Sequence, residues 1–125
     1  MTSERHVLVV EDDPDIAGLI CRRLRSLGLS SSHVSTGEAA VLVVRGDPPQ
    51  LVLLDLLLPG INGWDVIEAI RSDPATATIP VIVTTMLDRD GFEHLDVQGF
   101  LVKPFRASDL ERSITQVLSL PEAAT

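Results

Sequence analysis

The chain has 125 residues, 45% of them apolar, which is the size and composition of a single domain with one sizeable core. Its formal net charge of −8 at pH 7 argues against direct nucleic-acid binding, because such surfaces neutralise phosphates with Lys and Arg. A single cysteine, no signal peptide and no apolar run of the ~18 residues needed to span a membrane together predict a cytoplasmic protein without membrane insertion.

The N-terminal part predicts a buried strand followed by an amphipathic helix. The β-branched run at 6–10 is typical of a strand. The helix is expected to begin at Pro14, with Asp13 as its N-cap, and to stop at Gly28. Asp13 is therefore assigned to capping and not to metal binding. One apolar face of this helix is expected to consist of Ile16, Leu19, Ile20, Leu24 and Leu27.

Two more strand–helix pairs follow in the sequence. A weak strand is predicted over 30–35, and the motif STGE (35–38) is a capping box that predicts a helix running to about Arg45. The apolar run at 51–55 predicts a second buried strand. The helix after it is expected to be capped by Asn62.

The C-terminal part predicts strands over 80–85 and 99–102 and a last amphipathic helix over 108–120. A capping box from Ser108 to Glu111 is expected to start that helix. The segment 87–98 is ambiguous between a short helix interrupted by a glycine and a structured loop.

The strands alternate with helices, and the strongest of them are apolar on both faces. This order predicts an α/β protein with a parallel sheet covered by helices on both sides. We expect one domain over 1–120, and a tail or the start of a linker over 121–125.

Polar residues follow several of the predicted strands, and ligands of open parallel sheets bind outside the carboxyl ends of the strands. These residues are Glu11, Asp12, Asp13, Asp55, Thr84, Thr85 and Lys103. Carboxylates without His or Cys favour a hard cation, Mg²⁺ or Mn²⁺. A lysine and a hydroxyl group are suited to holding phosphate oxygens. The combination indicates phosphoryl transfer onto a carboxylate.

Four segments, 7–16, 51–67, 79–85 and 99–105, resemble the receiver domain of two-component response regulators in both order and separation. The resemblance covers essentially the whole chain and extends to the chemotaxis-regulator-like superfamily. It implies a flavodoxin-like, doubly wound (βα)5 fold with a five-stranded parallel sheet in the order 2-1-3-4-5.

The resemblance also implies a role for each site residue. Asp55 would accept a phosphoryl group from a histidine kinase or a histidine phosphotransfer protein. Mg²⁺, or alternatively Mn²⁺, would be held by Glu11 (directly or through water), Asp12, Asp55 and the backbone carbonyl of Leu57. Thr85 would contact the phosphoryl group and Phe100 would follow its movement, while Lys103, before a cis Pro104, would pair with the phosphoryl group. Thr84 is expected to be a packed strand residue.

Three features depart from the family pattern. Met86 follows Thr85 where the family usually has alanine, so Met86, with Leu57, is expected to tune access to Asp55. The stretch from Thr85 to Lys103 is short and reads DVQ before Gly99, which predicts a short or distorted fourth helix. The output surface that many members build around that helix is therefore not assigned. No effector domain is expected after the last helix.

The function expected is a phosphorylation-activated signalling switch that acts on a downstream protein and has no independent substrate. A phosphohydrolase of the haloacid dehalogenase type would need a second acid where this chain has Leu57. The remaining alternative is a pseudo-receiver, a protein-binding module that is never phosphorylated.

Overall fold

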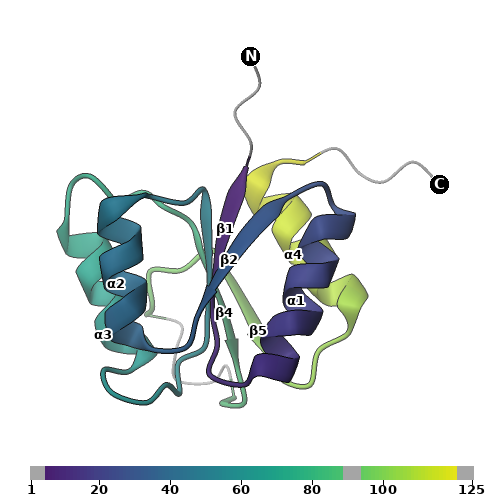
Figure 1. Ribbon diagram of the computed structural model, residues 1–125, viewed down its shortest axis with the longest axis horizontal. Coiled ribbons are helices and arrows are strands. Elements are labelled where there is room, and N and C mark those ends of the chain that lie inside the picture. Colours follow the sequence, from purple (N-terminus) through teal and green to yellow (C-terminus); the bar gives the residue numbers. More distant parts are fainter. Residues whose placement is uncertain (1–4, 89–93, 121–125) are drawn as a thin grey trace.

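The computed structural model describes residues 5–88 and 94–120, which form a five-stranded parallel sheet in the order β2-β1-β3-β4-β5 (Figure 1). The predicted fold class and strand order are confirmed. The strands are β1 (His6–Val10), β2 (Ser30–Val34), β3 (Leu51–Leu54), β4 (Val81–Thr85) and β5 (Gly99–Val102). The helices are α1 (Pro14–Ser26), α2 (Gly37–Gly46), α3 (Gly63–Ser72) and α4 (Ala107–Leu118).

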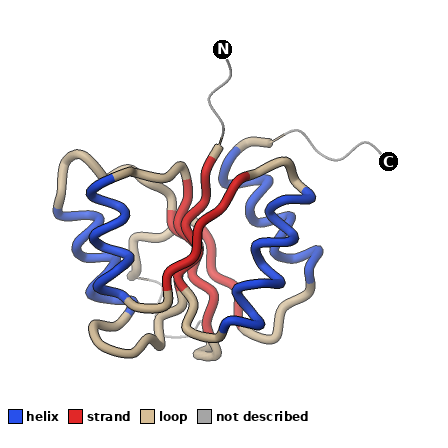
Figure 2. The backbone as a smooth tube through the Cα atoms, viewed as in Figure 1, coloured by secondary structure: helices blue, strands red, loops and turns tan. Residues whose placement is uncertain are grey.

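Helices cover both faces of the sheet, as Figure 2 shows. The helices α2 and α3 pack on one face over a cluster that includes Leu54 and Val66. The helices α1 and α4 pack on the other face over a cluster that includes Leu53 and Ile114. Neighbouring residues of β3 therefore point into opposite layers, as the alternation of side chains along a strand requires. None of the helices in the described ranges is both long and apolar enough to cross a membrane.

The caps of α1 and α3 agree with the prediction. The Asp13 side chain accepts a hydrogen bond from the backbone N–H of Asp15, and the Asn62 side chain accepts one from Asp65. Gly28 follows the end of α1 with a φ of 78°, a left-handed conformation that suits glycine at this position.

The two predicted capping boxes are wrong. The N-cap of α2 is Thr36, whose hydroxyl oxygen accepts from the N–H of Ala39, while the Glu38 side chain bonds to a different loop. The last helix begins earlier than expected, because the carboxylate of Asp109 accepts the backbone N–H of Arg106. A run of Ser, Thr and acidic residues offers several registers for such a cap, and the sequence alone does not select one.

The predicted apolar face of α1 is too wide. The side chains that the sheet and α4 bury are Ala17, Ile20 and Leu24, whereas Leu19 is 56% exposed. Leu19 lies one position before Ile20, about 100° away around the helix, so its side chain lies beside the buried face of α1 and not on it. Leu19 is therefore an apolar side chain that the core does not bury.

The connection between β4 and β5 is not helical in its described parts, 86–88 and 94–98. The rest of the predicted short or distorted fourth helix falls on residues 89–93, which lie outside the described residues. The end of the connection is tied to α3 by the guanidinium of Arg71, which donates to the carbonyl oxygens of Asp96 and Ile79 and to the side chain of Gln98. The Gln98 side chain also accepts the N–H of Val81.

Candidate functional site

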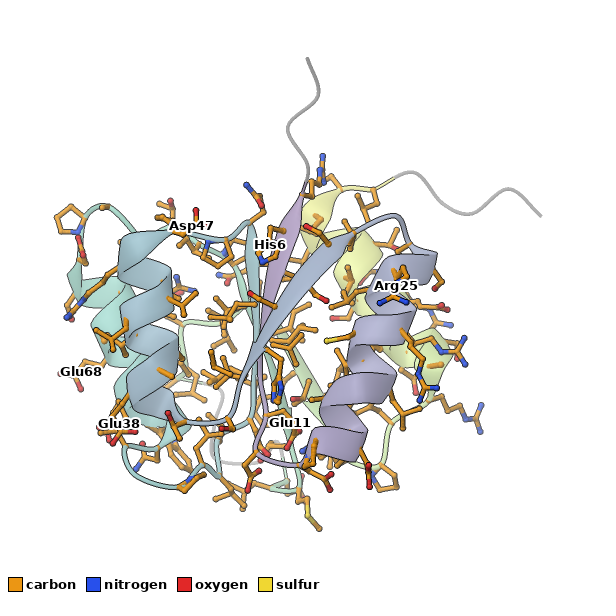
Figure 3. All side chains as sticks on the ribbon, viewed as in Figure 1. His6, Glu11, Arg25, Glu38, Asp47 and Glu68 are labelled. Carbon is orange, nitrogen blue, oxygen red and sulfur yellow. The ribbon has the colours of Figure 1, made fainter. Side chains whose placement is uncertain are left out.

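The carboxyl ends of three strands bring two buried carboxylates and an ammonium group together. The Nζ atom of Lys103 lies 2.5 Å from a carboxylate oxygen of Glu11 and 3.0 Å from one of Asp55. Glu11 is 1% exposed and Asp55 is 5% exposed. Figure 3 shows Glu11 at the end of the molecule opposite the two chain termini.

Strand pairing explains why these residues meet. Val10 of β1 pairs with Leu54 of β3, so the residues that follow, Glu11 and Asp55, leave the sheet side by side. The N–H of Asp55 continues the ladder by bonding to the carbonyl oxygen of Val10 at 3.0 Å. The N–H of Lys103 bonds to the carbonyl oxygen of Thr85 at 2.7 Å. This bond fixes the start of the Lys103 loop at the end of the β4–β5 strand pair. The Lys103–Pro104 peptide bond is cis, as the resemblance implied.

Burial and mutual contact shift the pKa values of Glu11 and Lys103. Burial raises the pKa of Glu11 above its ordinary value, although the hydrogen bond and charge of Lys103 act in the other direction. Burial alone would lower the pKa of Lys103, but the hydrogen bonds and charges of Glu11 and Asp55 outweigh it and raise that pKa. One ammonium group therefore serves two carboxylates, and it does not fully offset the cost of burying Glu11.

The same carboxylates form a cluster that fits a hard cation. Glu11, Asp12 and Asp55 each place a carboxylate oxygen within 4.8 Å of the others, and Asp12 is exposed to solvent. The donor set consists of oxygen alone, and one member faces water, as Mg²⁺ prefers because it keeps part of its hydration shell. The residues present therefore fit the ion that the sequence predicts.

The loop after β3 is folded back onto Asp55. The Oδ1 atom of Asp55 accepts the N–H of Leu57 at 3.0 Å, and the carbonyl oxygen of Leu56 accepts the N–H of Gly63 at 2.9 Å. Leu57, whose carbonyl was expected to bind the metal, lies in this loop with a side chain that is 48% exposed. The loop geometry next to Asp55 therefore depends on the contacts that hold 55–63.

The two expected switch residues, Thr85 and Phe100, lie on the paired strands β4 and β5. Thr85 is fully buried, and its hydroxyl oxygen accepts the N–H of Leu87 at 3.3 Å. Phe100 is half-buried and packs against the cluster under α2 and α3. Thr84 is 1% exposed, in agreement with its expected packing role.

An apolar groove beside the site was not predicted from the sequence. It has a volume of about 430 Å³ and lies between α1, α4 and the Lys103 loop. Its lining includes Ile16, Leu19, Met86, Lys103, Pro104 and Phe105. Met86 is 74% exposed, so its side chain contributes to this open surface. The signal in the sequence was the excess width of the apolar face of α1.

Curated proteins similar to this chain include regulators of transcription. The chain is 34% identical over 113 residues to the DNA-binding response regulator MtrA of Mycolicibacterium smegmatis, covering 87% of this chain and 48% of MtrA. It is 32% identical over 123 residues to the probable transcriptional regulator ycf27 of Pyropia yezoensis, covering 95% of this chain and 49% of ycf27. The chain spans about half the length of these relatives.

Solved structures with the same fold include the receiver domain of a sensor histidine kinase and a sensor protein. The receiver domain of the sensor histidine kinase PA1611 from Pseudomonas aeruginosa, with a magnesium ion coordinated in its active site cleft, matches with a TM-score of 0.86 and 26% identity. That match covers 94% of this chain and 99% of the other. A sensor protein from Polaromonas sp. JS666 matches with a TM-score of 0.86 and 30% identity, covering 94% and 98%.

These relatives correct one prediction about partners. From the net charge of −8 alone, the sequence predicts no direct nucleic-acid binding. Similar proteins, however, are named as DNA-binding and transcriptional regulators, and this chain matches only about half of each. Net charge reports on the surface of the part that carries it. The charge of this domain therefore gives no ground for excluding DNA binding by a longer protein that contains it.

The family assignment rests on a match over most of the chain. The family model described as the response regulator receiver domain matches residues 7–115. That range includes the buried Glu11–Lys103–Asp55 group and all five strands except the first residue of β1. The chain belongs to the response regulator receiver domain family of two-component systems.

Proposed function

We propose that this domain is a phosphorylation-activated switch in which Asp55 accepts a phosphoryl group from a histidine kinase or a histidine phosphotransfer protein. The observation that supports this most directly is the shared ion pair, in which the Nζ atom of Lys103 lies 3.0 Å from an oxygen of Asp55 and 2.5 Å from one of Glu11. A buried aspartate held beside an ammonium group at an open strand end has both a nucleophilic oxygen and a charge ready for the incoming phosphoryl oxygens.

The chemistry follows from the positions of these groups. A carboxylate oxygen of Asp55 forms a bond to phosphorus as the phosphorus–nitrogen bond to the donor histidine breaks, and the bonding electrons stay with the imidazole. The ammonium group of Lys103 then pairs with the negative charge on the phosphoryl oxygens. Glu11, Asp12, Asp55 and the Leu57 carbonyl would hold Mg²⁺, or Mn²⁺ in its place, which when bound offsets negative charge on the transferring group.

The apolar groove supports docking of the phosphoryl donor next to Asp55. Lys103 belongs both to the ion-paired group and to the groove lining, so the groove begins where the chemistry takes place. Leu19 and Met86 are 56% and 74% exposed, and such side chains suit the apolar face of a partner helix. We propose that Leu57 and Met86 also control how the donor and water reach Asp55.

The output of the switch is proposed to start at Thr85. A phosphoryl group on Asp55 offers its oxygens to the Thr85 hydroxyl, which at present accepts the N–H of Leu87. Exchange of that bond would release the loop after β4 and change the space available to Phe100. The product of the reaction is a modified surface, so the domain has no independent substrate. We propose further that residues 1–120 form this domain and that the protein is cytoplasmic.

Intact mass after incubation with acetyl phosphate and Mg²⁺ tests the proposal. The wild type should gain one phosphoryl group, and the Asp55→Asn variant, which keeps the shape of the side chain, should gain none. A gain in both proteins would assign the phosphorylation to another residue. No gain in the wild type, together with no binding of beryllofluoride, would reject phosphorylation and favour a pseudo-receiver that only binds other proteins.

A further inference from the structure

The loop that follows Asp55 is held from outside by the first turn of α2. One carboxylate oxygen of Glu38 accepts the backbone N–H of Ile61 at 3.3 Å. Both carboxylate oxygens also rest against Gly60, since a Cβ atom at Gly60 would lie 2.5 and 2.6 Å from them. Gly60 has a φ of 76°, so this turn already needs glycine for its backbone conformation.

A second close approach lies one residue before Glu38. A Cβ atom at Gly37 would lie 2.6 Å from the carbonyl oxygen of Ile61 and 2.6 Å from its Cγ1 atom. Gly37 and Glu38, at the N-terminal end of α2, therefore contact Gly60 and Ile61 closely. Figure 3 shows Glu38 at the same end of the molecule as Glu11.

The other end of the same loop is closed against the site itself. A Cβ atom at Gly63 would lie 2.5 Å from the Cα atom of Leu56 and 2.7 Å from the carbonyl oxygen of Asp55. The N–H of Gly63 bonds to the carbonyl oxygen of Leu56 at 2.9 Å. The loop is therefore in close contact with other parts of the chain on both sides of Leu57, at Gly63 and at Gly60 and Ile61.

We infer that Glu38 is a positioning residue, which holds the loop 56–62 in the conformation that would offer the Leu57 carbonyl to a metal ion beside Asp55. This inference rests on the proposed function for the identity of the ligand. Glu38 acts through the backbone of the loop, because the contacts found for its carboxylate are with Gly60 and Ile61. It belongs to no metal-binding cluster found in the described ranges.

Three variants separate a positional effect from an effect of charge. Glu38→Met keeps the length of the side chain and removes both the acceptor oxygen and the charge. Glu38→Gln removes the charge but keeps an oxygen that accepts the Ile61 N–H. Glu68→Met makes the same change of net charge at an exposed position on α3, and Figure 3 shows Glu68 on the outer side of that helix.

The first measurement is Mg²⁺ affinity by calorimetric titration. Glu38→Met should weaken binding roughly three- to tenfold, somewhat less than loss of a direct contact to a metal ligand. Glu38→Gln and Glu68→Met should bind within about twofold of the wild type, since long-range charge effects are screened in salt. Equal losses in Glu38→Met and Glu38→Gln would overturn the inference in favour of simple charge attraction, and so would unchanged binding by Glu38→Met.

The second measurement needs no metal. Amide hydrogen exchange of the metal-free proteins should be faster at Ile61 and Leu57 in Glu38→Met than in the wild type, and unchanged at the core residue Val52. Faster exchange in a domain whose wild type fails to bind Mg²⁺ would support the loop contact while rejecting the proposed function. Normal exchange in a domain that binds Mg²⁺ would reject the loop contact alone.

Discussion

Replacing Lys103 by methionine should destabilise the metal-free domain strongly at neutral pH. The substitution keeps most of the apolar stem and removes the ammonium group that lies 2.5 Å from Glu11 and 3.0 Å from Asp55. At an effective dielectric constant of 20, each of these attractions amounts to roughly 6 kcal/mol. Desolvation of the lysine opposes them, and removal of one partner from a buried ion pair typically costs 3–5 kcal/mol. The site opens to solvent at Asp12, so we expect about 3 kcal/mol.

The pH dependence of this loss has a definite sign. The pKa of Lys103 is raised, so its stabilising contribution is present below the ordinary value of 10.5 and disappears as the pH rises through the raised pKa. The pKa of Glu11 is also raised, which means that a proton on Glu11 relieves the cost of its burial. Loss of Lys103 raises that pKa further. The difference between variant and wild type should therefore shrink as the pH falls from neutral to about 5.

Urea unfolding with and without Mg²⁺ measures these effects. The Arg22→Met variant is the control, because it removes one positive charge from an exposed position on α1. Its free energy of unfolding should stay within about 0.5 kcal/mol of the wild type. Saturating Mg²⁺ should return part of the stability lost in Lys103→Met, because a cation again lies among the carboxylates. A Lys103→Met variant as stable as Arg22→Met at neutral pH would refute the electrostatic reasoning.

Two further predictions concern the frame of the site, and both are read from urea unfolding. Asp13→Ala removes the acceptor for the N–H of Asp15 at 2.9 Å and should cost about 1 kcal/mol, as expected for loss of an N-cap; no change would show that solvent replaces the cap at no cost. Gly63→Ala should cost more than about 2 kcal/mol because its Cβ atom would meet the backbone of Leu56, whereas Gly18→Ala, with nothing within 4 Å of its Cβ position, should stabilise α1 by about 0.5–1 kcal/mol. Equal effects of the two glycine substitutions would contradict the close packing described for the loop.

The sequence predicted the parallel sheet and placed the acidic residues and the lysine at one edge of it, because both follow from strong local patterns. The ion pairs of Lys103 with Glu11 and Asp55 were not predicted. Strands such as 51–54 are apolar on both faces. Few arrangements other than a parallel sheet covered by helices on both sides bury such strands. Once the strands are parallel, the residues that follow them must lie at one edge, so Glu11, Asp55 and Lys103 were expected at the same edge of the sheet.

The features that the sequence did not predict depend on contacts between distant segments. Glu38 matched a local capping pattern, yet its carboxylate bonds to Ile61, 23 residues away. Leu19 matched a helical apolar stripe, yet the sheet and α4 leave it 56% exposed. In both cases the local pattern was real, but the choice between local and distant partners depends on how the elements pack.

The charge balance of the site links stability to signalling. Glu11, Asp12 and Asp55 carry three negative charges against the single positive charge of Lys103, which leaves a net charge of −2 among groups that are mostly buried. A divalent cation would bring this sum to zero, so the metal-bound domain should be the more stable form. Phosphorylation of Asp55, as proposed, would replace one negative charge by about two and so disturb that balance by a single charge. The Thr85 hydroxyl oxygen accepts the N–H of Leu87 at 3.3 Å, a long hydrogen bond that it would exchange in response. Under the proposed function, a site that is neutral with the metal but carries an extra negative charge with the phosphoryl group would favour exchange of the hydrogen bond between Thr85 and Leu87.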